Sequence, residues 1–125
     1  MKKIILLLCC IPLLMATSCE NHDDNQIVCT TEFVYGLNVT VIDSQTEQPI
    51  TDGVIVTAVD GSYSETLVAF PGNENVFVGA GERPGTYIIT VAKDGYTTFT
   101  SNPLVVAANV CHVTPVQITV SLISN

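Results

Sequence analysis

Thiol and imidazole side chains can take the largest number of chemical roles in this chain, because they serve as nucleophiles, bases, disulfide partners and metal ligands. They are Cys9, Cys10, Cys19, Cys29, Cys111, His22 and His112. A catalytic triad would have to use His112, since His22 lies in a polar stretch near the N-terminus. Cys111 directly precedes His112, and consecutive strand residues point to opposite faces, so the two are poorly placed as nucleophile and base. We expect no catalytic residue, and we expect His112 to be a half-exposed residue at the edge of the last strand.

Metal binding has weak support in the sequence. No CxxC pair accompanies Cys29 or Cys111, and the histidines lack the short-spaced partners that a zinc centre needs. The segment from Asp60 to Glu65 places oxygen atoms at alternate positions, but it lacks the glycine and the terminal bidentate Glu of an EF-hand loop. A hairpin turning at Asp60-Gly61, with Glu65 facing solvent, is the simpler interpretation. We therefore expect no metal and no cofactor.

The N-terminal segment has the layout of an export signal. Lys2 and Lys3 precede an apolar run from Ile4 to Met15, and Ala16-Thr17-Ser18 leads into Cys19. A positive start, an apolar stretch and small residues before a cut site are what signal-peptide cleavage requires. The apolar run is shorter than the roughly 18 residues that a membrane-spanning helix needs. Residues 1–18 are therefore predicted to be a signal peptide that is removed.

The residues around Cys19 resemble the lipobox of bacterial lipoproteins, with Ala16 where that family usually has Leu. The resemblance implies cleavage before Cys19, a diacylglycerol on its thiol and a third acyl chain on its amine. Two or more acyl chains give stable attachment to a membrane. The alternative is an ordinary secretory signal that is cleaved nearby and leaves Cys19 as a plain thiol.

Residues 19–28 are predicted to form the lipidated cysteine and an acidic tether. The stretch from Glu20 to Gln26 is polar throughout and cannot bury a core. Fully extended, it reaches at most about 25 Å. Its acidic cluster resembles the signal that sends some Gram-negative lipoproteins to the outer cell surface, and a plain solvated linker is the alternative. We expect the domain to face the cell surface, with the periplasm as the other possibility.

The net charge of the mature chain limits the kinds of molecule that it can bind. Two of the four basic residues lie in the predicted signal peptide, which leaves Arg83 and Lys93 against twelve acidic residues, or 2 − 12 = −10. Binding to phosphate groups depends on clustered Lys and Arg side chains. Nucleic acid is therefore excluded as a partner.

Cys29 and Cys111 are the two cysteines that remain near the ends of the predicted domain. An exported chain lies in a compartment where disulfides persist. Closing a loop of roughly 80 residues would stabilise the fold by about 4 to 5 kcal/mol in the chain-entropy model. We predict a bridge between them, with two buried free thiols or a metal pair as the alternatives.

From Cys29 onward the hydrophobic pattern has a period of two, which indicates half-buried strands. No segment after the signal shows a sustained helical stripe. The predicted strands cover residues 33–43, 53–59, 63–70, 75–80, 86–92, 96–107 with a break at Pro103, and 113–123. Turn-forming pairs separate them, among them a hairpin at Asp60-Gly61 and a type II turn at Pro84-Gly85, with Gly85 at positive φ. The pattern predicts an all-β fold, a single seven-stranded antiparallel β-sandwich over residues 29–125.

Several segments together resemble the carboxypeptidase regulatory-like domain, a β-sandwich of the transthyretin type with an immunoglobulin-like layout. They are Gly36-Leu37-Asn38-Val39-Thr40-Val41-Ile42-Asp43, Gln48-Pro49-Ile50, Pro84-Gly85-Thr86-Tyr87-Ile88-Ile89-Thr90-Val91 and Lys93-Asp94-Gly95-Tyr96. The resemblance covers residues 33–123. It implies an accessory module of the kind found on peptidases, outer-membrane receptors and adhesins, and it carries no peptidase activity here because the zinc ligands are missing.

These observations predict a non-catalytic lipoprotein of the bacterial outer membrane, which contacts the membrane through lipid on Cys19. We expect its domain to act as a protein-interaction or accessory module with an envelope partner. The alternative is a carbohydrate-binding or adhesion module. The chain has no Trp, and its tyrosines and phenylalanines are expected mostly in the core, which lowers the support for glycan binding.

Overall fold

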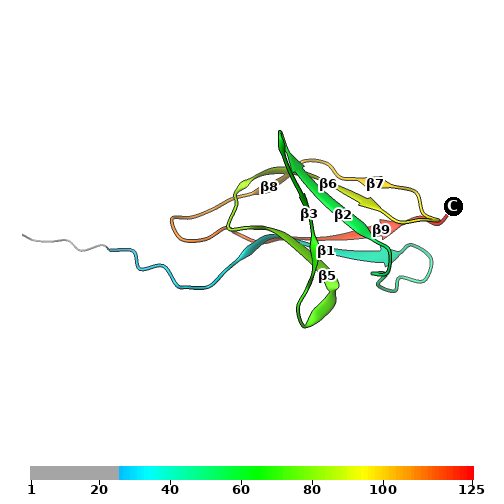
Figure 1. The fold of residues 1–125 in the computed structure, drawn as a ribbon, viewed down its shortest axis with the longest axis horizontal. Coiled ribbons are helices and arrows are strands. Elements are labelled where there is room, and N and C mark those ends of the chain that lie inside the picture. The colour runs from blue at the N-terminus through cyan, green and yellow to red at the C-terminus, as the bar shows by residue number, and fades with distance from the viewer. Residues whose placement is uncertain (1–25) are drawn as a thin grey trace, which may run out of the picture.

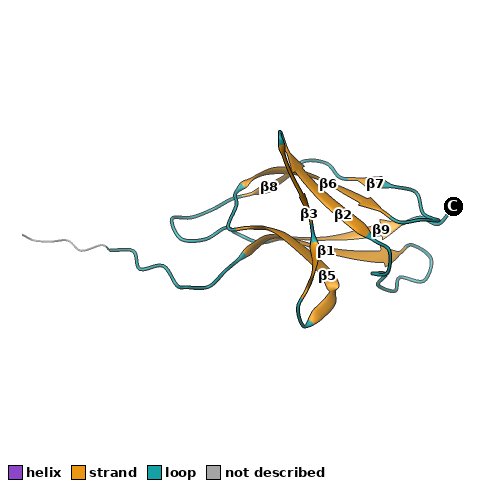
Figure 2. Ribbon diagram, in the orientation of Figure 1, coloured by secondary structure: helices purple, strands orange, loops and turns teal. Residues whose placement is uncertain are grey.

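The computed structural model describes residues 26–125. The predicted signal peptide, the lipid site at Cys19 and most of the acidic tether lie outside the described residues. The regular elements are strands (Figures 1 and 2): β1 Tyr35–Asp43, β2 Ile55–Asp60, β3 Tyr63–Thr66, β4 Val68–Phe70, β5 Asn73–Gly81, β6 Gly85–Ala92, β7 Phe99–Thr100, β8 Leu104–Val106 and β9 Val116–Leu122. Among the described residues, no helix is long and apolar enough to cross a membrane.

The strands form two sheets that pack against each other. One sheet has the order β4-β5-β1-β9, and the other has the order β3-β2-β6-β7, with β8 also paired to β6. Alternate residues of each strand point into the space between the sheets, as the period-two pattern requires. The fully buried side chains include Leu37, Val39, Val41, Val56, Tyr87, Ile89, Val91, Val106, Val120 and Leu122. The all-β prediction is confirmed, and the two packed sheets are consistent with a β-sandwich.

Residues 26–125 form nine strands where the sequence pattern predicts seven. The predicted strand 63–70 is two strands, because the chain leaves one sheet after Thr66 and enters the other at Val68. Leu67 lies buried between them, and its N–H still donates to the carbonyl of Val56 at 2.8 Å. The predicted strand 96–107 is likewise divided into β7 and β8 by residues 101–103, where Pro103 has no N–H to give to a ladder.

The prediction of a purely antiparallel sandwich is wrong at one pairing. The first and last strands, β1 and β9, run parallel, in a register that extends from Leu37 opposite Val116 to Asp43 opposite Leu122. Side chains alternate between the two faces in either kind of ladder, so the hydrophobic pattern does not reveal strand direction. The parallel pairing places the starts of β1 and β9 at the same end of the sheet.

Two glycine predictions have opposite outcomes. The hairpin at Asp60-Gly61 forms as predicted: Asp60 pairs with Tyr63, and Gly61 has a φ of 59°. Gly85 is not among the residues with positive φ in the described chain, so the predicted type II conformation there is wrong. Position 85 needs a glycine for another reason, since an added Cβ would overlap the carboxylate of Asp60.

Candidate functional site

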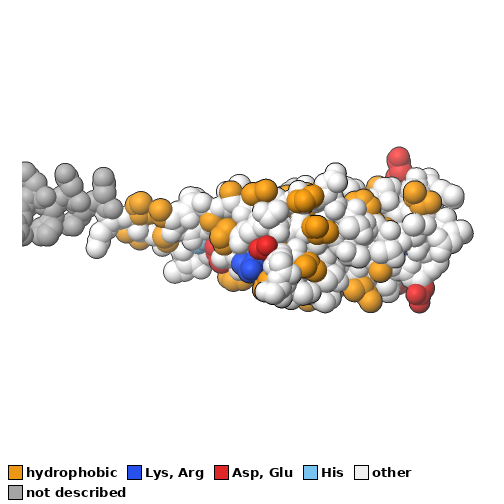
Figure 3. All heavy atoms as spheres, turned by 90° about the horizontal axis from the view of Figure 1, so that it is seen from above, with side chains coloured by type: hydrophobic (Ala, Val, Ile, Leu, Met, Phe, Trp, Pro, Cys, Tyr) orange, Lys and Arg blue, Asp and Glu red, His pale blue; other side chains and the backbone are white. Residues whose placement is uncertain are grey.

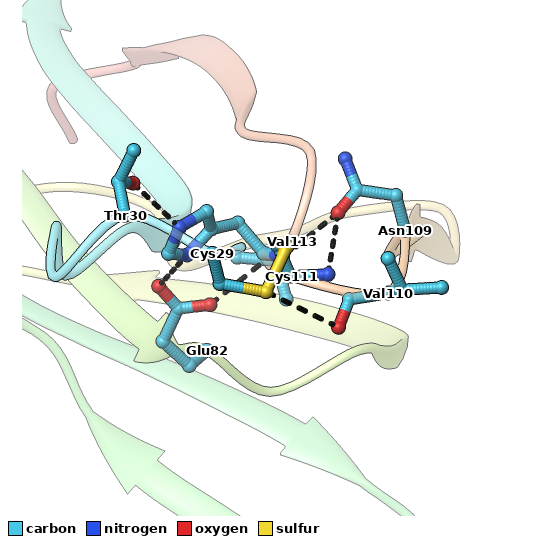
Figure 4. The surroundings of a disulfide bond; sticks show 8 residues. Cys29, Thr30, Glu82, Asn109, Val110, Cys111 and Val113 are labelled. Atoms are coloured by element: carbon cyan, nitrogen blue, oxygen red, sulfur yellow. Dashed lines mark hydrogen bonds and ion pairs between the residues drawn. A yellow bond between two sulfur atoms is a disulfide. The ribbon is translucent and has the colours of Figure 1, made fainter. Parts of the chain in front are cut away.

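The disulfide between Cys29 and Cys111 lies at the end of the sandwich where β1 and β9 begin (Figure 4). Its Cα atoms are 5.2 Å apart, and 82 positions separate the two residues in the sequence. The bond joins the segment before β1 to the loop of residues 107–115 that precedes β9. Both of these segments lie outside the named strands, so the disulfide supplies a covalent link beyond the ladders of the two sheets.

A hydroxyl, an imidazole and a carboxylate are aligned beside this disulfide. The Thr30 hydroxyl lies 2.9 Å from Nε2 of His112, and Nδ1 of His112 lies 2.7 Å from Oε1 of Glu82. The three residues come from the segment before β1, the loop before β9 and the turn after β5. We call Cys29, Thr30, Glu82, Cys111 and His112 the N-terminal clasp.

Glu82 is the centre of the polar contacts in the clasp. Its Oε1 also accepts the N–H of Val34 at 2.8 Å, and its Oε2 accepts the N–H of Val113 at 3.3 Å. Burial by itself would raise the pKa of the Glu82 carboxyl. The hydrogen bonds from His112, Val34 and Val113 outweigh that effect, so the pKa is lowered below its ordinary value. The carboxylate therefore joins its own turn to two other segments while it remains ionised.

The loop that carries Cys111 and His112 is held by a side chain of its own. Oδ1 of Asn109 accepts the N–H groups of Cys111 at 2.8 Å and His112 at 2.9 Å. An Asn side chain that bonds to the backbone two residues ahead is a common way to fix a turn. The N–H of Thr114 also donates to the carbonyl of Ala107 at 2.8 Å, which closes the loop at its base. The imidazole is thus presented toward Glu82 from an ordered turn.

The order of hydroxyl, imidazole and carboxylate is that of a catalytic triad, but the surroundings favour a structural role. Thr30 is exposed on the surface. Three cavities in the described part of the chain are lined by other residues. A triad acts on a substrate held beside preorganised donors for the developing oxyanion. The clasp contacts instead tie together three segments of the same chain.

A second polar cluster includes Asp60 and Glu65, the two ends of the segment whose oxygen atoms alternate along the sequence. Oδ2 of Asp60 is 3.0 Å from Nη1 of Arg83, whose guanidinium lies 3.7 Å from the centre of the Tyr63 ring. Glu65 does not face solvent as predicted, because its Oε2 accepts the Tyr63 hydroxyl and the N–H of Ala80, each at 2.8 Å. Both carboxylates are therefore engaged by protein donors. No group of three or more metal-ligating side chains occurs among residues 26–125.

The structure brings together some predicted residues and adds others. It joins Cys29 to Cys111, and it places the half-exposed His112 beside their bridge, while Cys19 lies outside the described residues. Thr30 and Glu82 could not be predicted from the sequence, because no local spacing links positions so far apart in the chain. No protein-family model and no curated protein matches this sequence. The family resemblance of residues 33–123 therefore stays a prediction.

Proposed function

We propose that this protein is a non-catalytic envelope lipoprotein, anchored by acyl chains on Cys19, whose β-sandwich is an accessory or protein-interaction module at the bacterial cell surface. The observation that carries the proposal is the N-terminal clasp. A segment that follows a membrane anchor transmits every displacement of the domain relative to the membrane. In this chain that segment is joined to the domain by a covalent bond and by the hydrogen bonds of Glu82 and His112.

The layout of the domain fits an anchor at one end. The described residues begin at one end of the long axis of the domain, next to the loop of residues 107–115. The C-terminus lies at the opposite end (Figure 1). A pull on the tether reaches Cys29 before it reaches β1. The disulfide passes part of that pull to Cys111 and so to β9. The load is then shared by two paired strands, and the far end of the domain stays free for a partner.

The proposal also includes a specific class for the β-sandwich. We assign the sandwich to the carboxypeptidase regulatory-like, transthyretin-type class on the strength of its sequence resemblance. One of the resembling segments turns as that assignment needs: Gly95 has a φ of 83°. The next residue, Tyr96, packs against the core, and its hydroxyl donates to Oδ2 of Asp43 at 2.8 Å.

Lipidation is tested on the protein extracted from membranes. Intact mass should show that residues 1–18 are absent and that Cys19 carries two or three acyl chains. The variant Cys19→Ser should lose both the added mass and the partition into a detergent phase. A wild-type protein that starts at another residue and stays in the aqueous phase would contradict the anchor.

Protease added to intact cells tests whether the domain lies on the cell surface or in the periplasm. Surface display predicts that the domain is removed while a periplasmic marker protein survives. Exchange of Asp23 and Asp24 for Asn should reduce display if the acidic cluster is a sorting signal. Digestion that needs a broken outer membrane would instead place the module in the periplasm.

A further inference from the structure

A groove lies on the outer face of the sheet that contains β1, on the side away from the core. It has a volume of about 540 Å³ and is lined by residues of β1, β4, β5 and β9, among them Asn38, Thr40, Phe70, Val76, Gln117 and Thr119. Asn38 and Thr40 face outward because they alternate with the buried Val39 and Val41. The groove is separate from the N-terminal clasp, whose residues do not line it.

The floor of the groove is an array of amide and hydroxyl groups. Asn38 lies opposite Gln117, and Thr40 lies opposite Thr119, on adjacent parallel strands about 4.8 Å apart. Within the described chain, the side chains of Thr40, Gln117 and Thr119 make no hydrogen bond to protein, whereas Asn38 donates to the carbonyl of Tyr35 at 3.3 Å. An amide side chain has two donor hydrogens and a carbonyl acceptor, and a hydroxyl can do both. The array therefore offers donors and acceptors side by side.

An aromatic ring forms one rim of the groove. The pairing of β4 with β5 shifts register between Ala69 and Phe70, so that Phe70 pairs with Asn73 at the end of the hairpin. Phe70 remains 40% exposed, although its ring makes an edge-to-face contact with Tyr35 at a centroid distance of 6.2 Å. An exposed aromatic face gives a sugar ring an apolar surface to stack on.

The groove has no charged lining residue, although the mature chain carries an excess of acidic groups. A phosphorylated or uronic acid ligand would find no cation there: Arg83 is paired with Asp60, and Lys93 donates to the carbonyl of Asp52. A lipid or an apolar peptide side chain would cover the amides without giving them partners, which costs free energy. The ligand that fits is neutral, rich in hydroxyl groups and able to stack one face on a ring.

We infer that this groove binds a neutral glycan. The inference goes beyond the proposed function, because it rests only on the domain being a non-catalytic module and gives that module a carbohydrate ligand, the alternative to a protein partner. Amide and hydroxyl groups would bond the sugar hydroxyls, and Phe70 would stack on a sugar ring at the rim.

Affinity electrophoresis of the whole protein, solubilised in a polyoxyethylene detergent that carries no sugar, tests the inference. The gels contain dextran, barley β-glucan, yeast mannan or xylan, and a gel with polygalacturonate serves as the anionic comparison. We expect at least one neutral polysaccharide to retard the protein and polygalacturonate not to. Phe70→Ala and Gln117→Ala should each weaken that retardation about 3- to 10-fold, the range for losing one stacking or hydrogen-bonding contact.

Ile88→Ala is the matched control, because Ile88 is 40% exposed, like Phe70, but belongs to the other sheet. Figure 3 views the molecule from above, the side on which β6 and β7 lie in Figure 1, and the hydrophobic side chains there lie singly and in small groups separated by other atoms. We expect this control to bind like the wild type. Absence of retardation by all four neutral polysaccharides, or retardation that survives both groove variants, would overturn the inference. The proposed anchor would be untouched by that result, since detergent partition and intact mass measure it separately.

Discussion

Loss of the disulfide should cost the domain a large part of its stability. The bond closes a loop with a sequence separation of 82. In the chain-entropy model the double change Cys29→Ser with Cys111→Ser then destabilises the native state by about 4.5 kcal/mol. Small domains are stable by only about 5 to 15 kcal/mol, so this is a substantial fraction. The effect arises chiefly in the unfolded chain, because the Glu82 and His112 contacts can hold the native segments in place without the bond.

Guanidinium chloride unfolding, followed by circular dichroism, measures this difference. With a denaturant dependence of about 4 kcal/mol per molar for a domain of this size, the midpoint should fall by about 1 M. Chemical reduction of the wild-type protein should give the same midpoint as the double variant. Val110→Ala is a matched control, because Val110 adjoins the bridge and is 74% exposed. We expect no shift for it.

Two results would refute the reasoning about the disulfide. One is the same guanidinium chloride midpoint of unfolding for the oxidised wild type and for the double variant. The other is quantitative alkylation of both thiols in the native, unreduced protein. A lowered midpoint together with lost glycan retardation would also contradict the separation of clasp and groove. We expect binding to stay near normal below the unfolding transition.

Two further predictions concern charged contacts. The pKa of Glu82 is lowered in the folded state from an ordinary value of 4.5, so its stabilising contribution is complete above pH 4.5 and is lost as the pH falls through the folded-state pKa. Glu82→Gln should therefore lower the urea midpoint at pH 7 and flatten its decline below pH 4.5, and an unchanged acid profile would count against the clasp contacts. Gly85→Ala should destabilise the domain by up to about 1 kcal/mol, because the new Cβ displaces the partly exposed Asp60 carboxylate from Arg83. Thermal unfolding of that variant with and without Asp60→Ala checks this, since two independent, additive losses would exclude the overlap.

The sequence predicts where strands lie better than it predicts which strands pair. Val39 and Val41 are fully buried and alternate with outward-facing polar residues, so their strand can be predicted from the hydrophobic pattern alone. The change of sheet at Leu67 is not, because an apolar residue continues the alternation whether or not the chain stays in its sheet. The role of Glu82 cannot be predicted from the sequence for a different reason. Its partners Val34 and His112 lie 48 and 30 positions away, and only the folded topology brings them to it.

The predicted disulfide requires the first and last strands to be neighbours or to face each other across the sandwich, and if they are neighbours it favours a parallel pairing over the predicted antiparallel one. Each cysteine comes shortly before a strand, Cys29 before the first and Cys111 before the last. In an antiparallel pair, the starts of two seven-residue strands would lie about 23 Å apart, at opposite ends. A disulfide requires Cα atoms within about 4.4 to 6.8 Å. Two cysteines that each precede one of two neighbouring strands meet through the shortest connections when both strands start at the same end. The observed parallel pairing of β1 with β9 and the 5.2 Å between the Cα atoms of Cys29 and Cys111 are therefore two consequences of one arrangement.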